Sequence, residues 1–137
     1  MVVDVLIEVP KGGFIKRELR GQGLVVDYVS PVPSPFNYGC IPGEPAPDGD
    51  FKDVIVLGPR LEAGTRLRLP VVGVVWFVDA GKTDDKLVAS ETPPLSGQDR
   101  RALHRFFRIY ALARRVLNLR RGLLGTTEFR GLGGPPR

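Results

Sequence analysis

The chain has one cysteine, one histidine, one methionine and one tryptophan among its 137 residues. The single cysteine, Cys40, excludes an internal disulfide and a cysteine-based metal site, which agrees with a reducing compartment. A lone histidine, His104, leaves nothing from which to build a histidine metal site or a Ser-His-Asp triad. No apolar run approaches the roughly 20 residues of a membrane-spanning helix. The first residues lack the basic flank and cleavage site of a signal peptide, so we expect a cytoplasmic protein with no membrane partner.

The length and the charge of the chain indicate its number of domains and the kind of partner it binds. A chain of 137 residues can bury one sizeable core but not two. We therefore expect a single domain over residues 1–122, followed by a loosely ordered tail over residues 123–137. The 20 basic residues, 15 of them arginine, outnumber the 15 acidic ones and give a net charge of +5. This surplus favours an anionic partner, either a phosphorylated small molecule or a nucleic acid.

Short β-branched runs separated by glycine and proline turns fill the first 90 residues. The expected strands are residues 2–9, 14–19, 24–29, 53–58, 65–79 and 86–90. Six prolines between Ser30 and Pro47 predict a long, stiff loop there, with neither a helix nor a central strand.

A different pattern follows Pro93 and Pro94. Ser96 with Asp99 is typical of a helix start, and Gly122 of a helix end. Apolar residues recur at helical spacing at Leu103, Phe106, Phe107, Tyr110, Ala113 and Leu117. The arginines on the opposite face are most simply a solvated surface, with a nucleic-acid stripe as the alternative. The order of elements predicts a mainly β fold, a small five- to six-stranded barrel with one packed amphipathic helix near the C-terminus.

Two acidic loops suggest a metal site. Asp48, Asp50 and Asp53 lie within six residues before an apolar strand, and Asp79 and Asp84 follow another. Carboxylates at such density repel one another unless cations or protons lie between them, and hard oxygen ligands favour magnesium, calcium or manganese over zinc. A solvated acidic turn is the alternative for each loop taken alone.

Further polar residues extend this hypothesis. Glu8, at the end of the first strand, is a candidate outer ligand. Lys16, Lys86 and Tyr38 are donors that suit phosphate oxygens. Each could instead be an ordinary surface or edge residue, but metals together with cationic donors indicate phosphoryl chemistry.

The chain resembles the family I inorganic pyrophosphatases over residues 3–115. The matching motifs, in chain order, are Ile7–Pro10, Lys16–Glu18, Asn37–Pro42, Asp48–Asp50 with Asp53, Asp79 with Asp84 and Lys86, and Phe106–Phe107 with Tyr110. The resemblance implies an OB-like barrel, a homo-oligomer and magnesium-dependent hydrolysis of inorganic diphosphate. It also implies specific roles. Asp50 would be the catalytic base, the metal residues would be Glu8, Asp48, Asp53, Asp79 and Asp84, and the substrate site would contain Lys16, Glu18, Tyr38, Lys86 and Tyr110.

The chain departs from the family pattern at two residues that would bind phosphate. Tyr28 stands where the family has an arginine, and Ala111 where it has a lysine. Losing two charged hydrogen bonds without replacement would weaken binding or turnover by about a hundredfold or more. Three cations could compensate: Arg114, Arg17 and Lys52.

Two other functions remain open at this stage. The metals could serve hydrolysis of an organic diphosphate or a nucleotide. Alternatively, the chain could be a catalytically reduced OB-type module that binds nucleic acid or a protein partner. The acidic loops argue against nucleic acid because they would repel it.

Overall fold

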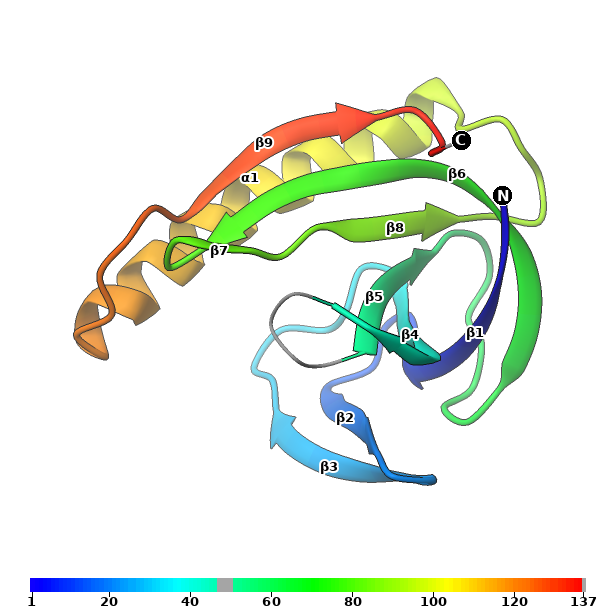
Figure 1. The fold of residues 1–137 in the computed structure, drawn as a ribbon, viewed down its shortest axis with the longest axis horizontal. Helices are drawn as coiled ribbons and strands as arrows, with labels where there is room; N and C mark the ends of the chain where they lie inside the picture. The colour runs from blue at the N-terminus through cyan, green and yellow to red at the C-terminus, as the bar shows by residue number, and fades with distance from the viewer. Residues whose placement is uncertain (47–50, 137) are drawn as a thin grey trace.

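Five strands close a β-barrel in the computed structural model, which describes residues 1–46 and 51–136 (Figure 1). They are β1 (Val2–Val9), β4 (Asn37–Pro45), β5 (Phe51–Val56), β8 (Lys86–Ala89) and β6 (Arg66–Asp79). The neighbours pair in that order, and β6 pairs with β1 to complete the circle. All pairings are antiparallel except that of β5 with β8. The predicted mainly β barrel with one helix is confirmed.

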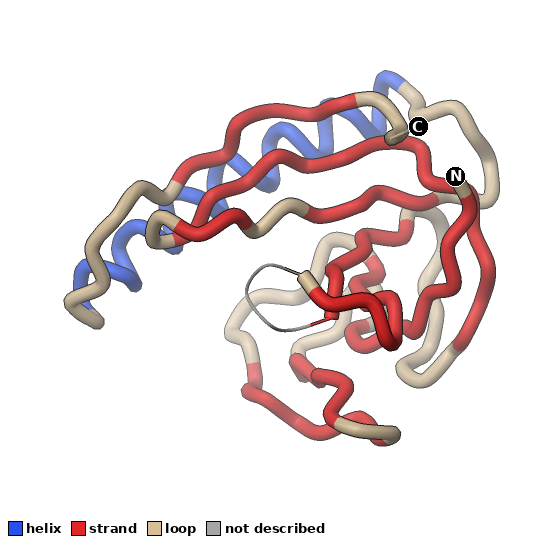
Figure 2. The backbone as a smooth tube through the Cα atoms, viewed as in Figure 1, coloured by secondary structure: helices blue, strands red, loops and turns tan. Residues whose placement is uncertain are grey.

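Alternation of side chains along the strands forms the core inside the barrel. Val3, Val5 and Ile7 of β1 point inward, where they join a buried aliphatic cluster from the other four strands. Leu6 points to the opposite side, where it packs with Leu19 beneath a separate hairpin. That hairpin consists of β2 (Ile15–Arg20) and β3 (Gly23–Val29), which lie beside the barrel (Figure 2).

Helix α1 (Gly97–Arg120) packs against the outer surface of β6 and β8 (Figure 1). Its N-cap is Ser96, whose hydroxyl accepts a hydrogen bond from the Asp99 amide at 3.0 Å, as the sequence predicts. Gly122, with φ +68°, follows the C-cap residue. Leu103 and Phe107 are buried against the barrel. In the described part of the chain, no helix is both long and apolar enough to span a membrane.

The prediction of an unstructured loop from Ser30 to Pro47 is wrong for its second half. Strand β4 is central, and its first residues, Asn37–Ile41, pair with β5 on one side while β1 lies on the other. The prolines lie on either side of this doubly paired stretch, where they remove no ladder hydrogen bond from it. Gly39 permits the close approach, because a Cβ there would collide with the Leu6 carbonyl group.

The segment expected to be a loosely ordered tail contains a strand. β9 (Glu128–Gly133) pairs antiparallel with the second half of β6, with Val78 opposite Glu128 and Val74 opposite Gly133. A two-residue strand, β7 (Lys82–Thr83), pairs with the last residues of β6. The tail prediction is therefore wrong for residues 128–133, where two glycines in six residues obscure the strand pattern.

Candidate functional site

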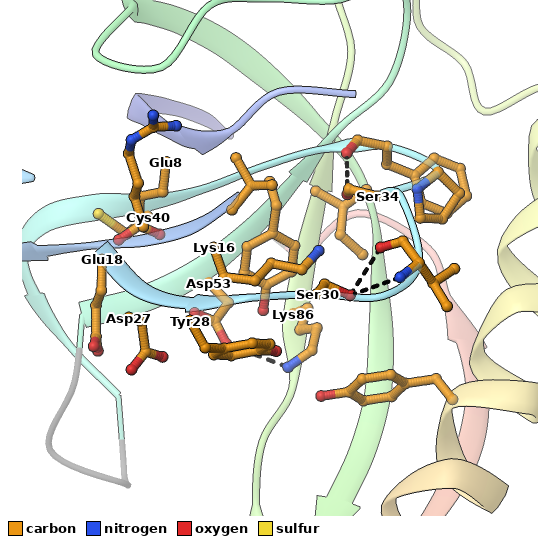
Figure 3. Close-up of a pocket in the computed structure, with 18 of the residues that line it drawn as sticks. Glu8, Lys16, Glu18, Asp27, Tyr28, Ser30, Ser34, Cys40, Asp53 and Lys86 are labelled. Atoms are coloured by element: carbon orange, nitrogen blue, oxygen red, sulfur yellow. Dashed lines mark hydrogen bonds and ion pairs between the residues drawn. The ribbon is translucent and has the colours of Figure 1, made fainter. Parts of the chain in front are cut away.

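A cavity of about 760 Å³ lies between the hairpin, the loop 30–36, the barrel and α1 (Figure 3). One part of its wall is polar and comes from β1, β2, β4, β5 and β8. The other part is apolar and includes Val32, Phe36, Phe106 and Ile109. The loop is anchored to the helix because the rings of Phe36 and Phe106 pack edge to face, with centroids 5.7 Å apart. The predicted site residues that line this cavity are Glu8, Lys16, Glu18, Tyr38, Asp53, Lys86 and Tyr110.

The centre of the polar wall is an ammonium group between two carboxylates. Lys86 is 3% exposed, and its Nζ lies 3.2 Å from Asp53 Oδ2 and 3.0 Å from Asp84 Oδ2. Burial alone would lower the pKa of Lys86, but the two carboxylates outweigh it and raise the pKa above its usual value. Lys86 therefore stays charged and marks a position where a cation is stabilised.

Tyr38 lies beside this group. Its pKa is raised well above the ordinary value, first by burial and then by the Asp53 carboxylate, to which its hydroxyl is hydrogen-bonded. The Lys86 Nζ lies 5.9 Å from the centroid of its ring. Tyr38 therefore remains a neutral hydroxyl that can donate one hydrogen bond. The preceding residue, Asn37, is fully buried and fixes two loops, since its Oδ1 accepts from the amides of Lys11 and Leu61, both at 2.9 Å.

Glu8 is buried at the base of the cavity. Its Oε2 accepts a hydrogen bond from the Leu19 amide at 2.8 Å. Burial, with smaller contributions from Asp53 and Glu18, raises the pKa of Glu8 to about 7. Glu8 is therefore partly protonated near neutral pH in the absence of a cation. The neighbouring Cys40 stays a thiol, because burial and then Glu8 raise its pKa to about 12.

The hairpin contributes cationic side chains to the wall of the cavity. Lys16 lies opposite Tyr28 in the β2–β3 ladder, and burial lowers the pKa of its ammonium group. Glu18 lines the cavity and pairs with Arg20 at 2.8 Å. Arg20, which sequence reasoning missed, and Arg17 both line the cavity. Arg17 thus adds a guanidinium group to the wall of the cavity.

Tyr110 closes the polar wall from the helix. Its ring packs against those of Phe77 and Phe106, with centroids 5.4 and 5.7 Å away. Burial raises the pKa of its hydroxyl, which lies near the charges of Lys86 and Arg114. Tyr110 is therefore a neutral donor held rigidly by aromatic packing.

Asp79 lies apart from the cavity. Its Oδ2 accepts from Arg114 Nη2 at 2.7 Å, and its Oδ1 accepts from Asn118 Nδ2 at 2.8 Å. The structure thus places Arg114 on a carboxylate, whereas the sequence suggested a role in gripping phosphate. The sequence held no signal for Asn118, because its partner is 39 residues away along the chain.

The sequence suggested several other residues, whose places differ. Asp48 and Asp50 lie outside the described residues. Ala111 is 4% exposed and packs in the interface between helix and barrel, while Tyr28 lines the cavity. Lys52 is not among the lining residues.

The donor set suits a hard divalent cation in part. Asp53 and Asp84 present carboxylate oxygens that converge on one positive charge, as the Lys86 contacts show. Within residues 1–46 and 51–136, no three histidine, cysteine or acidic side chains gather closely enough to hold a metal ion by themselves. Asp53 and Asp84 are thus the described carboxylates that could hold a cation at this position.

Comparison with known sequences gives a consistent match. A family model described as inorganic pyrophosphatase matches residues 5–118. The soluble inorganic pyrophosphatase of Oryza sativa subsp. indica is 40% identical over 93 residues, which cover 64% of this chain and 44% of the rice protein. The inorganic pyrophosphatase of Sulfolobus acidocaldarius is 39% identical over 93 residues, 64% of this chain and 54% of that protein. The chain spans about half the length of these curated relatives.

Comparison with solved structures agrees with the sequence match. An inorganic pyrophosphatase from Neisseria gonorrhoeae superposes with a TM-score of 0.79 at 28% sequence identity, covering 97% of this chain and 82% of that chain. The matched sequence and the fold therefore agree. The chain therefore belongs to the inorganic pyrophosphatase family.

Proposed function

We propose that the protein hydrolyses inorganic diphosphate to two phosphates with Mg²⁺ as cofactor. The observation that carries this proposal is the polar wall of the cavity. It presents two ammonium groups, Lys16 and Lys86, and two neutral hydroxyls, Tyr38 and Tyr110, beside the Asp53 carboxylate. Such a set matches an anion with many phosphate oxygens that is bound together with a cation.

The side chains would divide the work. Lys16 and Arg17, on the hairpin side of the cavity, would hold the phosphate oxygens. Tyr110 would donate a hydrogen bond that orients the substrate, and Tyr38 would do the same once its hydroxyl leaves Asp53. Lys86 would neutralise charge on the leaving phosphate, because it stays protonated. We keep Asp50 as the proposed base that takes a proton from the attacking water.

Asp53 and Asp84, with Asp48 as the further ligand indicated by the sequence, would hold Mg²⁺, and Glu8 would be an outer residue. When bound, the cation would lower the pKa of coordinated water and offset substrate charge. Glu8 would act through its position, since its carboxyl group lies near the charge of Asp53 and fixes the hairpin through the Leu19 amide. The proposal places the protein in the cytoplasm, where Cys40 would stay reduced.

The test is phosphate release from inorganic diphosphate, measured with Mg²⁺ and with a chelator. We expect release that depends on Mg²⁺ and falls at least a hundredfold in Asp50→Asn and Asp53→Asn. The matched control is Glu62→Gln, an exposed carboxylate that does not line the cavity, which should leave the rate within twofold. Equal rates in Asp53→Asn and in the unchanged protein would refute the proposal.

A second candidate function is favoured by the apolar part of the cavity. Val32 and Ile109 are 64% and 63% exposed and line its outer part. This surface would suit the organic group of a diphosphate ester, which inorganic diphosphate does not have. Comparing kcat/KM for inorganic diphosphate and for geranyl diphosphate would separate the two. A ratio in favour of the ester would establish the second function.

We also propose that the protein is a homo-oligomer. Four large apolar side chains recur at helical spacing on the outer face of α1: Ile109, Leu112, Val116 and Leu119, which are 52–74% exposed. A stripe of this kind usually covers another apolar surface. Sedimentation should show an assembly that dissociates in Leu112→Glu but not in Arg108→Glu. A monomeric unchanged protein would contradict the proposal.

A further inference from the structure

The Asp79 carboxylate is occupied by donors from the protein itself. Arg114 binds one oxygen at 2.7 Å and Asn118 binds the other at 2.8 Å. Arg114 and Asn118 are four residues apart on α1, so their side chains lie on the same face of the helix. The side chain of Asp79 is 18% exposed and that of Arg114 is 27% exposed, so water competes only weakly for this ion pair.

Buried neighbours fix the orientation of Asn118. It is 4% exposed, and its Nδ2 also lies 3.0 Å from the Oγ1 of Thr127, which is itself buried. The same Oγ1 accepts from the Ala80 amide at 2.9 Å. Reversing the Asn118 amide would turn its oxygen toward the Asp79 carboxylate oxygen and remove the N–H donor from this contact. The donors at Asp79 therefore belong to a network that joins the end of β6, α1 and the segment before β9.

The other acidic residues of the site have a different environment. Asp53 lines the cavity, and Asp84 is joined to it through the Lys86 ammonium group. Asp79 does not line the cavity, although Arg114 lies close to Tyr110 and Tyr28, which do. A positive charge is thus fixed next to the cavity at the end that Asp79 occupies.

We propose that Arg114, aligned by Asn118, takes the place of a divalent cation at Asp79. The site then binds one Mg²⁺ fewer than it would with Asp79 as a ligand. The proposal rests on the proposed function, in which Mg²⁺ is bound near Asp53 and Asp84. A guanidinium group is charged at every working pH and is attached to the chain, so its contribution does not depend on the Mg²⁺ concentration.

The test is a titration of the protein with Mn²⁺ alone. Calorimetry and the electron paramagnetic resonance signal of the free ion give the number of bound ions and their affinity. Asp79→Asn should bind the same number of ions as the unchanged protein, with affinity within twofold. Asp53→Asn is the matched comparison and should weaken binding at least tenfold. Arg114→Met should gain one ion, and the added change Asp79→Asn should remove that ion again.

Two outcomes would overturn the proposal. One is the loss of an ion, or a tenfold weaker affinity, in Asp79→Asn made on the unchanged background. The other is a folded Arg114→Met protein that gains no ion. If Arg114→Met does not fold, the Asp79→Asn titration decides alone, since that change preserves side-chain size. The titration contains no diphosphate, so failure of the proposed hydrolysis would appear in the phosphate-release assay and leave the ion count intact.

Discussion

Replacing Lys86 by methionine removes the cation between Asp53 and Asp84. The side chain of Lys86 is 3% exposed, whereas those of Asp53 and Asp84 are 26% and 19% exposed. Methionine keeps most of the buried volume, so the main effect is electrostatic. Breaking a buried ion pair from one side costs about 3–5 kcal/mol, and the partial exposure of both carboxylates favours the lower value. We expect a loss of about 3 kcal/mol in the free energy of unfolding.

Urea unfolding in the presence of a chelator measures this loss. With a slope of about 1.5 kcal/mol per molar urea, the midpoint should fall by about 2 M. Lys82→Met, which removes an exposed lysine, is the control and should shift it by less than about 0.3 M. Mg²⁺ should restore more stability to Lys86→Met than to the unchanged protein, because it can take the position of the lost ammonium group beside the two carboxylates. A midpoint equal to that of Lys82→Met would refute the reasoning.

Three further changes test the barrel and the helix. The pKa of Glu8 is raised from 4.5 to about 7, so the stability that its protonated form contributes is present below pH 4.5 and is lost as pH rises through 7. In chelator at pH 8, Glu8→Gln should therefore be more stable by up to about 3 kcal/mol, with no gain at pH 4 in urea unfolding. Gly39→Ala should cost at least about 2 kcal/mol by the same assay, because its Cβ meets the Leu6 carbonyl, whereas Gly23→Ala has open space. Phe107→Ala should cost about 3–5 kcal/mol by thermal unfolding, and Arg105→Ala, which changes an exposed residue of α1, less than about 0.5.

Much of the fold could be predicted from residue patterns that lie within a single segment of the chain. The β-branched run over residues 2–9 identifies β1, and the Ser96 cap identifies the start of α1. Strand β4 was missed because prolines on both sides hid a short ladder that depends on contacts with β1 and β5. Strand β9 was missed because its glycines give no alternation, and only its pairing with β6 defines it.

The candidate site also has residues that the sequence predicts and contacts that it does not. Asp53, Lys86 and Tyr110 were found because their spacing along the chain matches a known pattern, and all three line one cavity. The environment of Asp79 could not be predicted, because it depends on Arg114 and Asn118 meeting a turn 35 and 39 residues away. Burial also determines the high pKa of Glu8, and a pattern of residue types does not give burial.

Closure of the barrel through β6 has a consequence for the order of folding. Val2 pairs with Pro70 and Val5 with Leu67, so the first strand acquires its second neighbour only after some 70 residues have been synthesised. Contacts this distant in sequence are slow to form, because the entropic cost of closing a long loop comes before any stabilising contact is made. A nascent chain thus exposes the valine-rich edge of β1 during synthesis, and that edge is where off-pathway association would begin.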